Sequence, residues 1–192
     1  MTATDEWSRA DCARILRQIG YGAILALALI VSGRASAEVT AIAQNGFEVR
    51  NIARVAATPD KVYAALIAPA RWWDSDHTFS GSAANLTLDA HAGGCWCETL
   101  PNGGSVLHLT VVFASPGKML RLRGALGPFQ SFGADGAMTW SLKPVEGGTD
   151  LTLVYALGGY NKDGFDAISK AADGVLSGQM QRLKQFVETG SP

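Results

Sequence analysis

GFDAISKAADGVLSGQMQRLKQFVE, residues 164–188, decides the fold. On a helix of 3.6 residues per turn its apolar side chains share one face. They are Phe165, Ile168, Ala172, Val175, Leu176, Met180, Leu183, Phe186 and Val187. So long an apolar face has to pack on a wide apolar surface, and a curved sheet is the natural partner.

Gln179 interrupts that face with an amide, which needs a polar partner. We expect it to face a cavity and to hydrogen-bond either a sheet side chain or a bound molecule. Gly174 and Gly178 map to the opposite side, where they should loosen the helix.

The segment upstream of this helix has the pattern of an antiparallel meander. Short alternating stretches separated by tight turns cover residues 47–57, 84–89, 95–99, 106–113, 119–123, 137–143 and 151–156. Thr58-Pro59-Asp60 predicts the start of a short helix, and a second short turn follows at 70–74. In the stretch 106–113 strict alternation places Leu107, Leu109, Val111 and Phe113 on the buried face, with His108 pointing away from the core.

The first 37 residues are typical of a secretory signal peptide. Arginines precede an apolar run at 19–31, and Ala35-Ser36-Ala37 supplies a cleavage site of small residues. The run has 13 residues, fewer than the roughly 20 that a spanning helix needs. We therefore expect a signal peptide at 1–37, a linker at 38–46 and one domain at 47–189, with a periplasmic or secreted location. An uncleaved N-terminal membrane tether is the alternative; after cleavage no stable membrane insertion is expected.

The composition excludes some partners and leaves others open. The formal net charge is −1, and no basic patch is present, so nucleic acid is not an expected partner. Cys95 and Cys97 lie two positions apart, where the Cα atoms of a regular strand are roughly 6.5–7 Å apart, at the limit for a disulfide. The simpler interpretation is two reduced thiols, and the alternative is a redox pair or half of a metal site with His91. We expect no metal and no cofactor.

Several motifs, in their order, resemble the START-like (SRPBCC) superfamily. They are Thr58-Pro59-Asp60, Val62-Tyr63, Trp72-Trp73, Gly93-Gly94-Cys95-Trp96-Cys97-Glu98, Glu146-Gly147-Gly148-Thr149-Asp150-Leu151 and the long final helix. The branch that they resemble is related to the Hsp90 ATPase activator homology domain and is often labelled polyketide cyclase. The resemblance implies an α+β helix-grip fold: a curved antiparallel β-sheet wrapped around a long C-terminal helix, with two short helices after the first strand. It also implies a cavity between sheet and helix.

A cavity of this kind would be lined by aromatic and a few polar side chains. The candidate ligand-binding residues are Trp72, Trp73, Trp96, Glu98, Phe129, Phe132, Trp140, Tyr155 and Gln179. If Trp96 points inward, alternation turns Glu98 inward too, where burial would raise the pKa of an unpaired carboxyl. The alternative places Glu98 at a solvated strand end. Glu98 and His77, in a loop over the cavity mouth, are the catalytic candidates.

Three functions remain open from the sequence. The first is an exported, non-enzymatic protein that binds a small hydrophobic ligand. The second is an enzyme of polyketide cyclase or hydrolase type that acts in the same cavity. The third is a protein-interaction module that uses the outer sheet face. The oligomeric state is not indicated.

Overall fold

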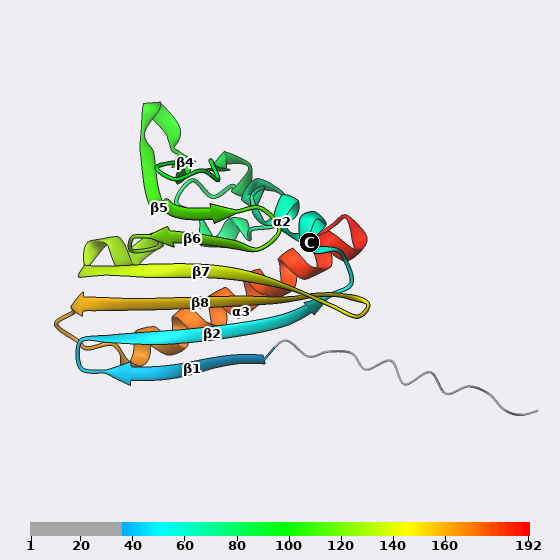
Figure 1. The fold of residues 1–192 in the computed structure, drawn as a ribbon. Coiled ribbons are helices and arrows are strands. Elements are labelled where there is room, and N and C mark those ends of the chain that lie inside the picture. The colour runs from blue at the N-terminus through cyan, green and yellow to red at the C-terminus, as the bar shows by residue number, and fades with distance from the viewer. Residues whose placement is uncertain (1–35) are drawn as a thin grey trace, which may run out of the picture. The chain divides into compact units, whose positions relative to one another are not determined.

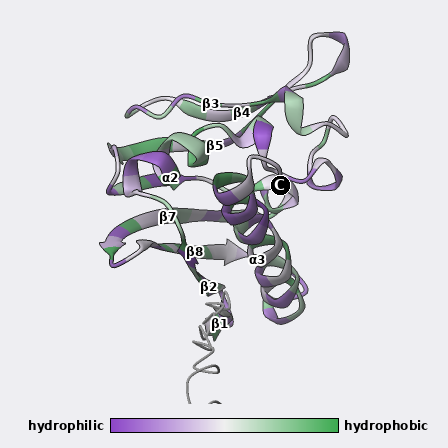
Figure 2. Ribbon diagram, turned by 90° about the vertical axis from the view of Figure 1, so that its right-hand side faces the viewer, coloured by the Kyte–Doolittle hydropathy of each residue, from purple (hydrophilic) through white to green (hydrophobic). Residues whose placement is uncertain are grey.

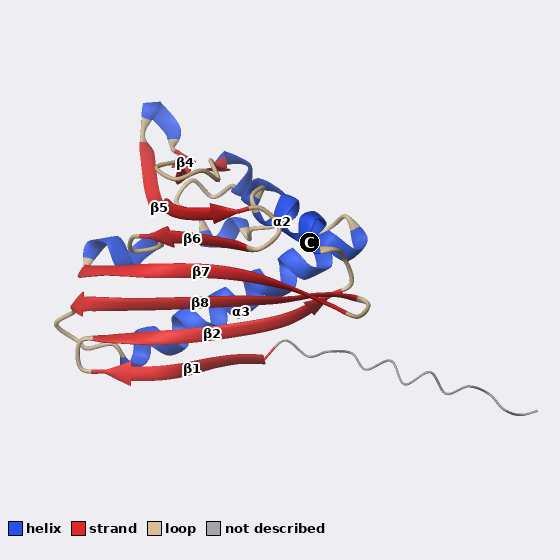
Figure 3. Cartoon of the chain, viewed as in Figure 1, coloured by secondary structure: helices blue, strands red, loops and turns tan. Residues whose placement is uncertain are grey.

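The structure is a computed structural model that describes residues 36–192, so the expected signal peptide lies outside the described residues, apart from Ser36 and Ala37. One antiparallel sheet of eight strands runs in the order β1-β2-β8-β7-β6-β5-β4-β3. The strands are β1 (Ser36–Ala43), β2 (Gly46–Val55), β3 (Leu86–Leu88), β4 (Cys95–Thr99), β5 (Ser105–Ser115), β6 (Met119–Arg123), β7 (Gly133–Val145) and β8 (Gly148–Tyr160). Figure 1 shows the strands side by side, and Figure 3 separates them from the helices by colour.

The long C-terminal helix α3 (Asp166–Thr189) lies diagonally across one face of this sheet (Figures 1 and 2). Most members of the predicted apolar face are buried, among them Leu176, Met180 and Leu183. Gly174 and Gly178 lie on the opposite side, with open space where a Cβ would be. The predicted helix-grip architecture is therefore confirmed.

The chain between β2 and β3 crosses from one part of the sheet to its far edge. It forms the helix α2 (Pro59–Leu66) and three short 3₁₀ helices: η1 (Pro69–Arg71), η2 (Ser75–His77) and η3 (Ala83–Asn85). Pro59 begins α2 where its missing N–H costs no hydrogen bond. Two further 3₁₀ helices, η4 (Pro101–Gly103) and η5 (Gly127–Ser131), follow β4 and β6. This crossing segment and η5 surround the cavity described below.

The linker prediction for residues 38–46 is wrong for most of its length, because β1 covers Ser36–Ala43 and pairs with β2. The segment has few large apolar residues, and β1 is an edge strand whose side chains need little burial. Backbone pairing, with Val39 opposite Val49, gives it a place in the sheet. Sequence alternation carries no signal for such a strand.

The prediction for β5 is wrong at three residues, Leu107, His108 and Phe113. The pairing register shifts between Trp96 and Cys97, where Leu109 and Leu107 are the successive partners, so His108 is an extra residue in β5. An extra residue of this kind, a β-bulge, reverses the inward and outward pattern. His108 is consequently buried and Leu107 is 56% exposed, the reverse of the expectation. A second shift opposite β6 turns Phe113 outward.

Several large apolar side chains are exposed, and only some of them belong to β5. They are Ile42, Phe79, Leu107, Val112, Phe113 and Tyr160. In residues 36–192, no helix has both the length and the apolar composition needed to cross a membrane.

Candidate functional site

A cavity of about 370 Å³ lies between α3, the far strands of the sheet and two loops. Its walls come from four places in the sequence: residues 73–79 around η2, the strands β3 to β5, residues 126–129 at η5, and residues 171–176 of α3. The lining is mostly apolar, and aromatic rings come from Trp73, Phe79, Trp96 and Phe129. Aromatic walls with a few polar groups are typical of small-molecule pockets.

Three of the predicted binding aromatics line this cavity, namely Trp73, Trp96 and Phe129. Trp72 and Trp140 do not. They are fully buried and pack edge to face, with ring centroids 6.3 Å apart. Phe132 and Tyr155 contact Phe129 from outside the lining. Trp72 and Trp140 therefore support the wall of the cavity from the core.

Tyr155 positions the loop that forms one side of the cavity. Its hydroxyl accepts a hydrogen bond from the N–H of Leu126 at 2.9 Å and donates to the carbonyl of Gly124 at 3.2 Å. Burial raises the pKa of this phenol far above its ordinary value. Gly124, with φ of +136°, turns the chain from β6 towards η5. The neutral hydroxyl thus fixes the residues just before η5.

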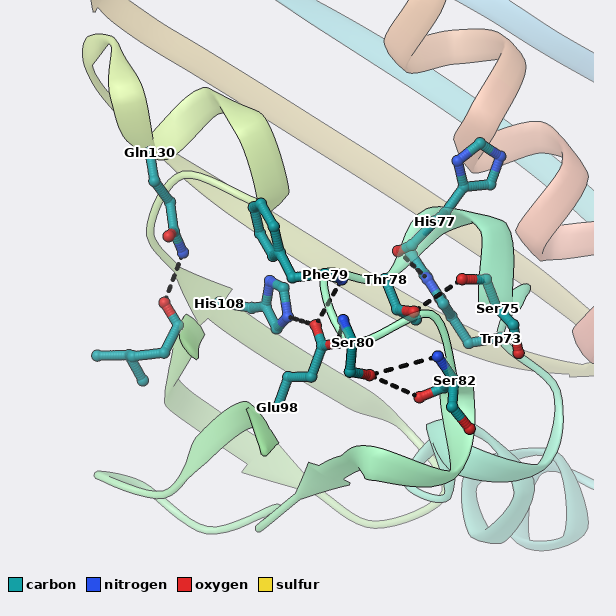
Figure 4. Close-up of polar contacts among 11 residues, drawn as sticks. Trp73, Ser75, His77, Thr78, Phe79, Ser80, Ser82, Glu98, His108 and Gln130 are labelled. Carbon is teal, nitrogen blue, oxygen red and sulfur yellow. Dashed lines mark hydrogen bonds and ion pairs between the residues drawn. The ribbon is translucent and has the colours of Figure 1, made fainter. Parts of the chain in front are cut away.

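Glu98 is buried, so its predicted inward orientation holds and the solvated alternative is wrong. Its carboxylate accepts hydrogen bonds from the backbone N–H groups of Ser80 at 2.5 Å and Phe79 at 3.2 Å. Nε2 of His108 lies 2.9 Å from the same carboxylate (Figure 4). Glu98 is therefore a paired carboxylate behind the cavity wall, and it does not line the cavity itself.

The pairing decides the direction of the Glu98 pKa. Burial by itself would raise it, but the hydrogen bonds from Ser80, His108 and Phe79 favour the ionised form and together outweigh burial. The pKa of Glu98 is consequently lowered below its ordinary value. The increase that we expected for an unpaired carboxyl does not apply, because the partners come from a loop and a bulge that alternation does not reveal.

His108 is the functional candidate that the sequence analysis missed. It lines the cavity, is 5% exposed, and stacks on Phe79 with ring centroids 5.9 Å apart. Its Nδ1 atom is buried with no hydrogen-bond partner, and so is Nε1 of Trp96, another lining residue. The bulge in β5 that turns His108 inward leaves no trace in the alternation of the sequence.

His77 lies at the cavity mouth, as we expected for its loop, and its side chain is exposed. Its carbonyl oxygen accepts a hydrogen bond from Nε1 of Trp73 at 3.0 Å. The backbone carbonyl of His77 therefore orients the indole of Trp73, which forms one aromatic wall of the cavity (Figure 4).

Gln179 is buried on α3, but the expected partner is wrong. Its Oε1 accepts a hydrogen bond from the backbone N–H of Asp74 at 2.9 Å, and Gln179 is not part of the cavity lining. Neighbouring Arg182 donates from Nε to the carbonyl of Trp72 at 2.9 Å. Gln179 thus holds the loop before η2 against α3, because it is the acceptor for a backbone N–H that would otherwise be unpaired.

Cys95 and Cys97 form a disulfide, so the simpler interpretation of two reduced thiols is wrong. The two Cα atoms are 5.5 Å apart, closer than in a regular strand and within the range that a disulfide requires. His91 pairs with Asp89 and not with these cysteines. Within the described part of the chain, no three His, Cys, Asp or Glu side chains are grouped so that they could hold a metal ion.

Comparison with solved structures gives the same fold. An uncharacterised protein from Rhizobium leguminosarum is 17% identical, with a TM-score of 0.58 over 81% of this chain and 98% of that chain. CalU16 from Micromonospora echinospora is 16% identical, with a TM-score of 0.55 over 84% of this chain and 86% of that one. The Aha1 dimer from Colwellia psychrerythraea is 16% identical, with a TM-score of 0.51 over 76% of this chain and 98% of that chain. At these identities the likeness shows the fold alone.

No curated protein matches the chain. A family model does match, described as polyketide cyclase / dehydrase and lipid transport, and it covers residues 46–188, well over half of the chain. It begins at β2 and ends in the last turn of α3, so it includes every wall of the cavity. The chain therefore belongs to the polyketide cyclase / dehydrase and lipid transport family of the START-like (SRPBCC) superfamily.

Proposed function

We propose that this protein binds a small hydrophobic molecule in the cavity and has no catalytic role there. The observation that carries the proposal is the cavity itself, of about 370 Å³ and mostly apolar in lining. That volume lies at the small end of the range of about 300–1,000 Å³ found for ligand pockets. The family to which the chain belongs is associated with lipids and other hydrophobic molecules.

We also propose that the domain is exported. The disulfide between Cys95 and Cys97 supports this location, because disulfides persist in oxidising compartments and are rare in the cytosol. The test is to express the full chain in a bacterium and to measure the mass of the periplasmic product. A protein that begins at Glu38 is expected, whereas an uncleaved chain in the membrane fraction would support the tethered alternative.

Ligand capture tests the binding proposal. The purified protein is incubated with an extract of lipids and aromatic compounds, separated from free compounds, and analysed by native mass spectrometry. Retention of compounds with mainly apolar surfaces is the expected result. A cavity that retains nothing, even at saturating concentrations of extract, would refute the proposal.

A matched pair of variants on α3 tests whether the captured compounds bind in the cavity. Ala171 lines the cavity and is exposed at its edge, so Ala171→Trp should fill part of it and reduce retention about tenfold or more. Gln181 is also exposed on α3 but lies outside the lining, so Gln181→Trp should retain the same compounds as the wild type. Equal loss in both variants would show that the retained compounds bind elsewhere.

The buried pair of Glu98 and His108 favours a second candidate, an enzyme of cyclase or hydrolase type. A carboxylate that orients an imidazole beside a cavity is an arrangement used in general base catalysis. Turnover of an aromatic ester such as 2-naphthyl acetate, with a pH–rate profile abolished in Glu98→Gln, would support it. Unchanged turnover in that variant would remove this pair from any mechanism.

A further inference from the structure

The imidazole of His108 lies between two fixed neighbours. Figure 4 shows its ring between the carboxylate of Glu98 and the ring of Phe79. His108 is 5% exposed, and it is the one buried titratable side chain among the described residues that line the cavity. Whether the free ring nitrogen of His108 donates or accepts a hydrogen bond therefore decides which polar group of a ligand can bind at this wall of the cavity.

The contacts of Glu98 determine where the His108 proton lies. Ser80 and Phe79 both donate backbone N–H groups to the carboxylate, so Glu98 is held as an anion that can only accept. Nε2 of His108 must therefore carry a hydrogen and donate it to Glu98. In the neutral ring, Nδ1 is then a bare acceptor.

This acceptor has no partner in the described part of the protein. A buried acceptor without a donor is unfavourable, and most such groups in proteins are paired. Nε1 of Trp96, a donor on the same cavity's lining, is also unpaired. A ligand hydroxyl has the complementary chemistry, since it donates one hydrogen and keeps lone pairs that accept.

We propose that the cavity selects a phenol whose hydroxyl donates its hydrogen to Nδ1 of His108. The aromatic ring of the ligand lies among Trp73, Trp96 and Phe129. Phe79, which is 55% exposed and stacked on the imidazole, turns outward to admit it. This inference rests on the proposed function, because it assigns a ligand class to the same cavity.

Two probes of nearly equal size test it, 2-naphthol and 2-methylnaphthalene, by equilibrium dialysis. Hydrophobic transfer alone favours the methyl compound, so a preference for the naphthol reports a hydrogen bond. We expect the wild type to bind 2-naphthol about tenfold more tightly than 2-methylnaphthalene. In His108→Leu, whose side chain has no hydrogen-bond acceptor, the preference should vanish while the affinity for 2-methylnaphthalene stays within about twofold.

A measurement on the wild type does not depend on how the variant folds. The ¹⁵N resonance of Nδ1 should show an unprotonated nitrogen in the free protein and move on addition of 2-naphthol, but not of 2-methylnaphthalene. Equal affinities for the two probes, or a protonated Nδ1 in the free protein, would overturn the phenol assignment and leave hydrophobic binding intact. Failure of both probes to bind would overturn the phenol assignment, whereas the proposed function fails only if the extract capture also retains nothing.

Discussion

Nε2 of His108 lies 2.9 Å from the carboxylate of Glu98, and the two side chains come from adjacent strands, β5 and β4. Both are buried, and the same carboxylate holds the backbone of Phe79 and Ser80. One acidic side chain therefore joins the sheet, the cavity wall and the loop at the cavity mouth.

Replacing Glu98 with Ala should destabilise the protein by about 3 kcal/mol, because His108 and two backbone N–H groups lose their acceptor. Urea unfolding at pH 7 measures the free energy of unfolding. Glu146→Ala, in the exposed turn between β7 and β8, is the control and should change it by less than about 0.5 kcal/mol. A loss below about 1 kcal/mol in Glu98→Ala would contradict the role that we assign to the carboxylate.

The lowered pKa of Glu98 predicts a pH dependence of stability. The folded protein binds this proton less readily than the unfolded chain, where a Glu pKa is about 4.3. The resulting stabilisation is present above that value and is lost as the pH falls through the lower folded value. The difference in unfolding free energy between wild type and Glu98→Gln should therefore shrink between pH 5 and pH 3. A difference that stays constant over that range would be inconsistent with the ionised pair.

Replacing Gln179 with Leu should remove the acceptor for the N–H of Asp74 and leave it unpaired. We expect a loss of about 1–2 kcal/mol in unfolding free energy and faster hydrogen exchange at the Asp74 amide. Gln181→Leu, on the exposed side of α3, serves as the comparison and should leave that exchange rate unchanged. Unaltered exchange in Gln179→Leu would show that the loop is held by other contacts.

The disulfide should add little to overall stability, because it closes a ring of only a few residues. Chain-entropy arguments give about 1.5 kcal/mol for a loop this short. Cys95→Ser combined with Cys97→Ser should lower the unfolding free energy by that amount. Alkylation followed by mass spectrometry, on a protein that lacks Cys12, should add two labels after reduction and none before it. Labelling of the unreduced protein would contradict the disulfide.

Tyr155→Phe should loosen residues 124–126 by removing both hydrogen bonds of the hydroxyl, at a cost of about 1–2 kcal/mol. Tyr160→Phe, at a largely exposed position, is the matched control and should be neutral. Because burial raises the pKa of Tyr155, its phenol should stay protonated at pH 11. Absorbance titration up to pH 11 should therefore detect as many tyrosinates in Tyr155→Phe as in the wild type.

Much of the fold could be predicted from sequence because its patterns are local. The apolar face of α3 follows the helical period, and Pro59 and the glycine-rich turns mark element ends. β1 could not be predicted, since an edge strand can depend on backbone pairing more than on buried side chains. The prediction of which β5 side chains are buried failed for another reason. A bulge inserts one residue into the strand, and the alternation rule assumes that none is inserted.

The candidate site was only partly predictable because its contacts are between distant segments. Trp73, Trp96 and Phe129 were chosen by residue type, and they line the cavity. The partner of Gln179 is a loop N–H more than a hundred positions away, and no periodicity identifies it. His108 was assigned to the outside by the same alternation that failed for β5.

The strand order has a consequence for how the chain folds. β2 pairs with β8, so Val49 lies opposite Tyr155, and more than half of the chain has to be made before that pairing is possible. Contacts between such distant segments slow folding, because the intervening chain loses entropy before it gains contacts. During synthesis the domain should therefore stay open until its last third has left the ribosome, and the cavity should be among the last features to form.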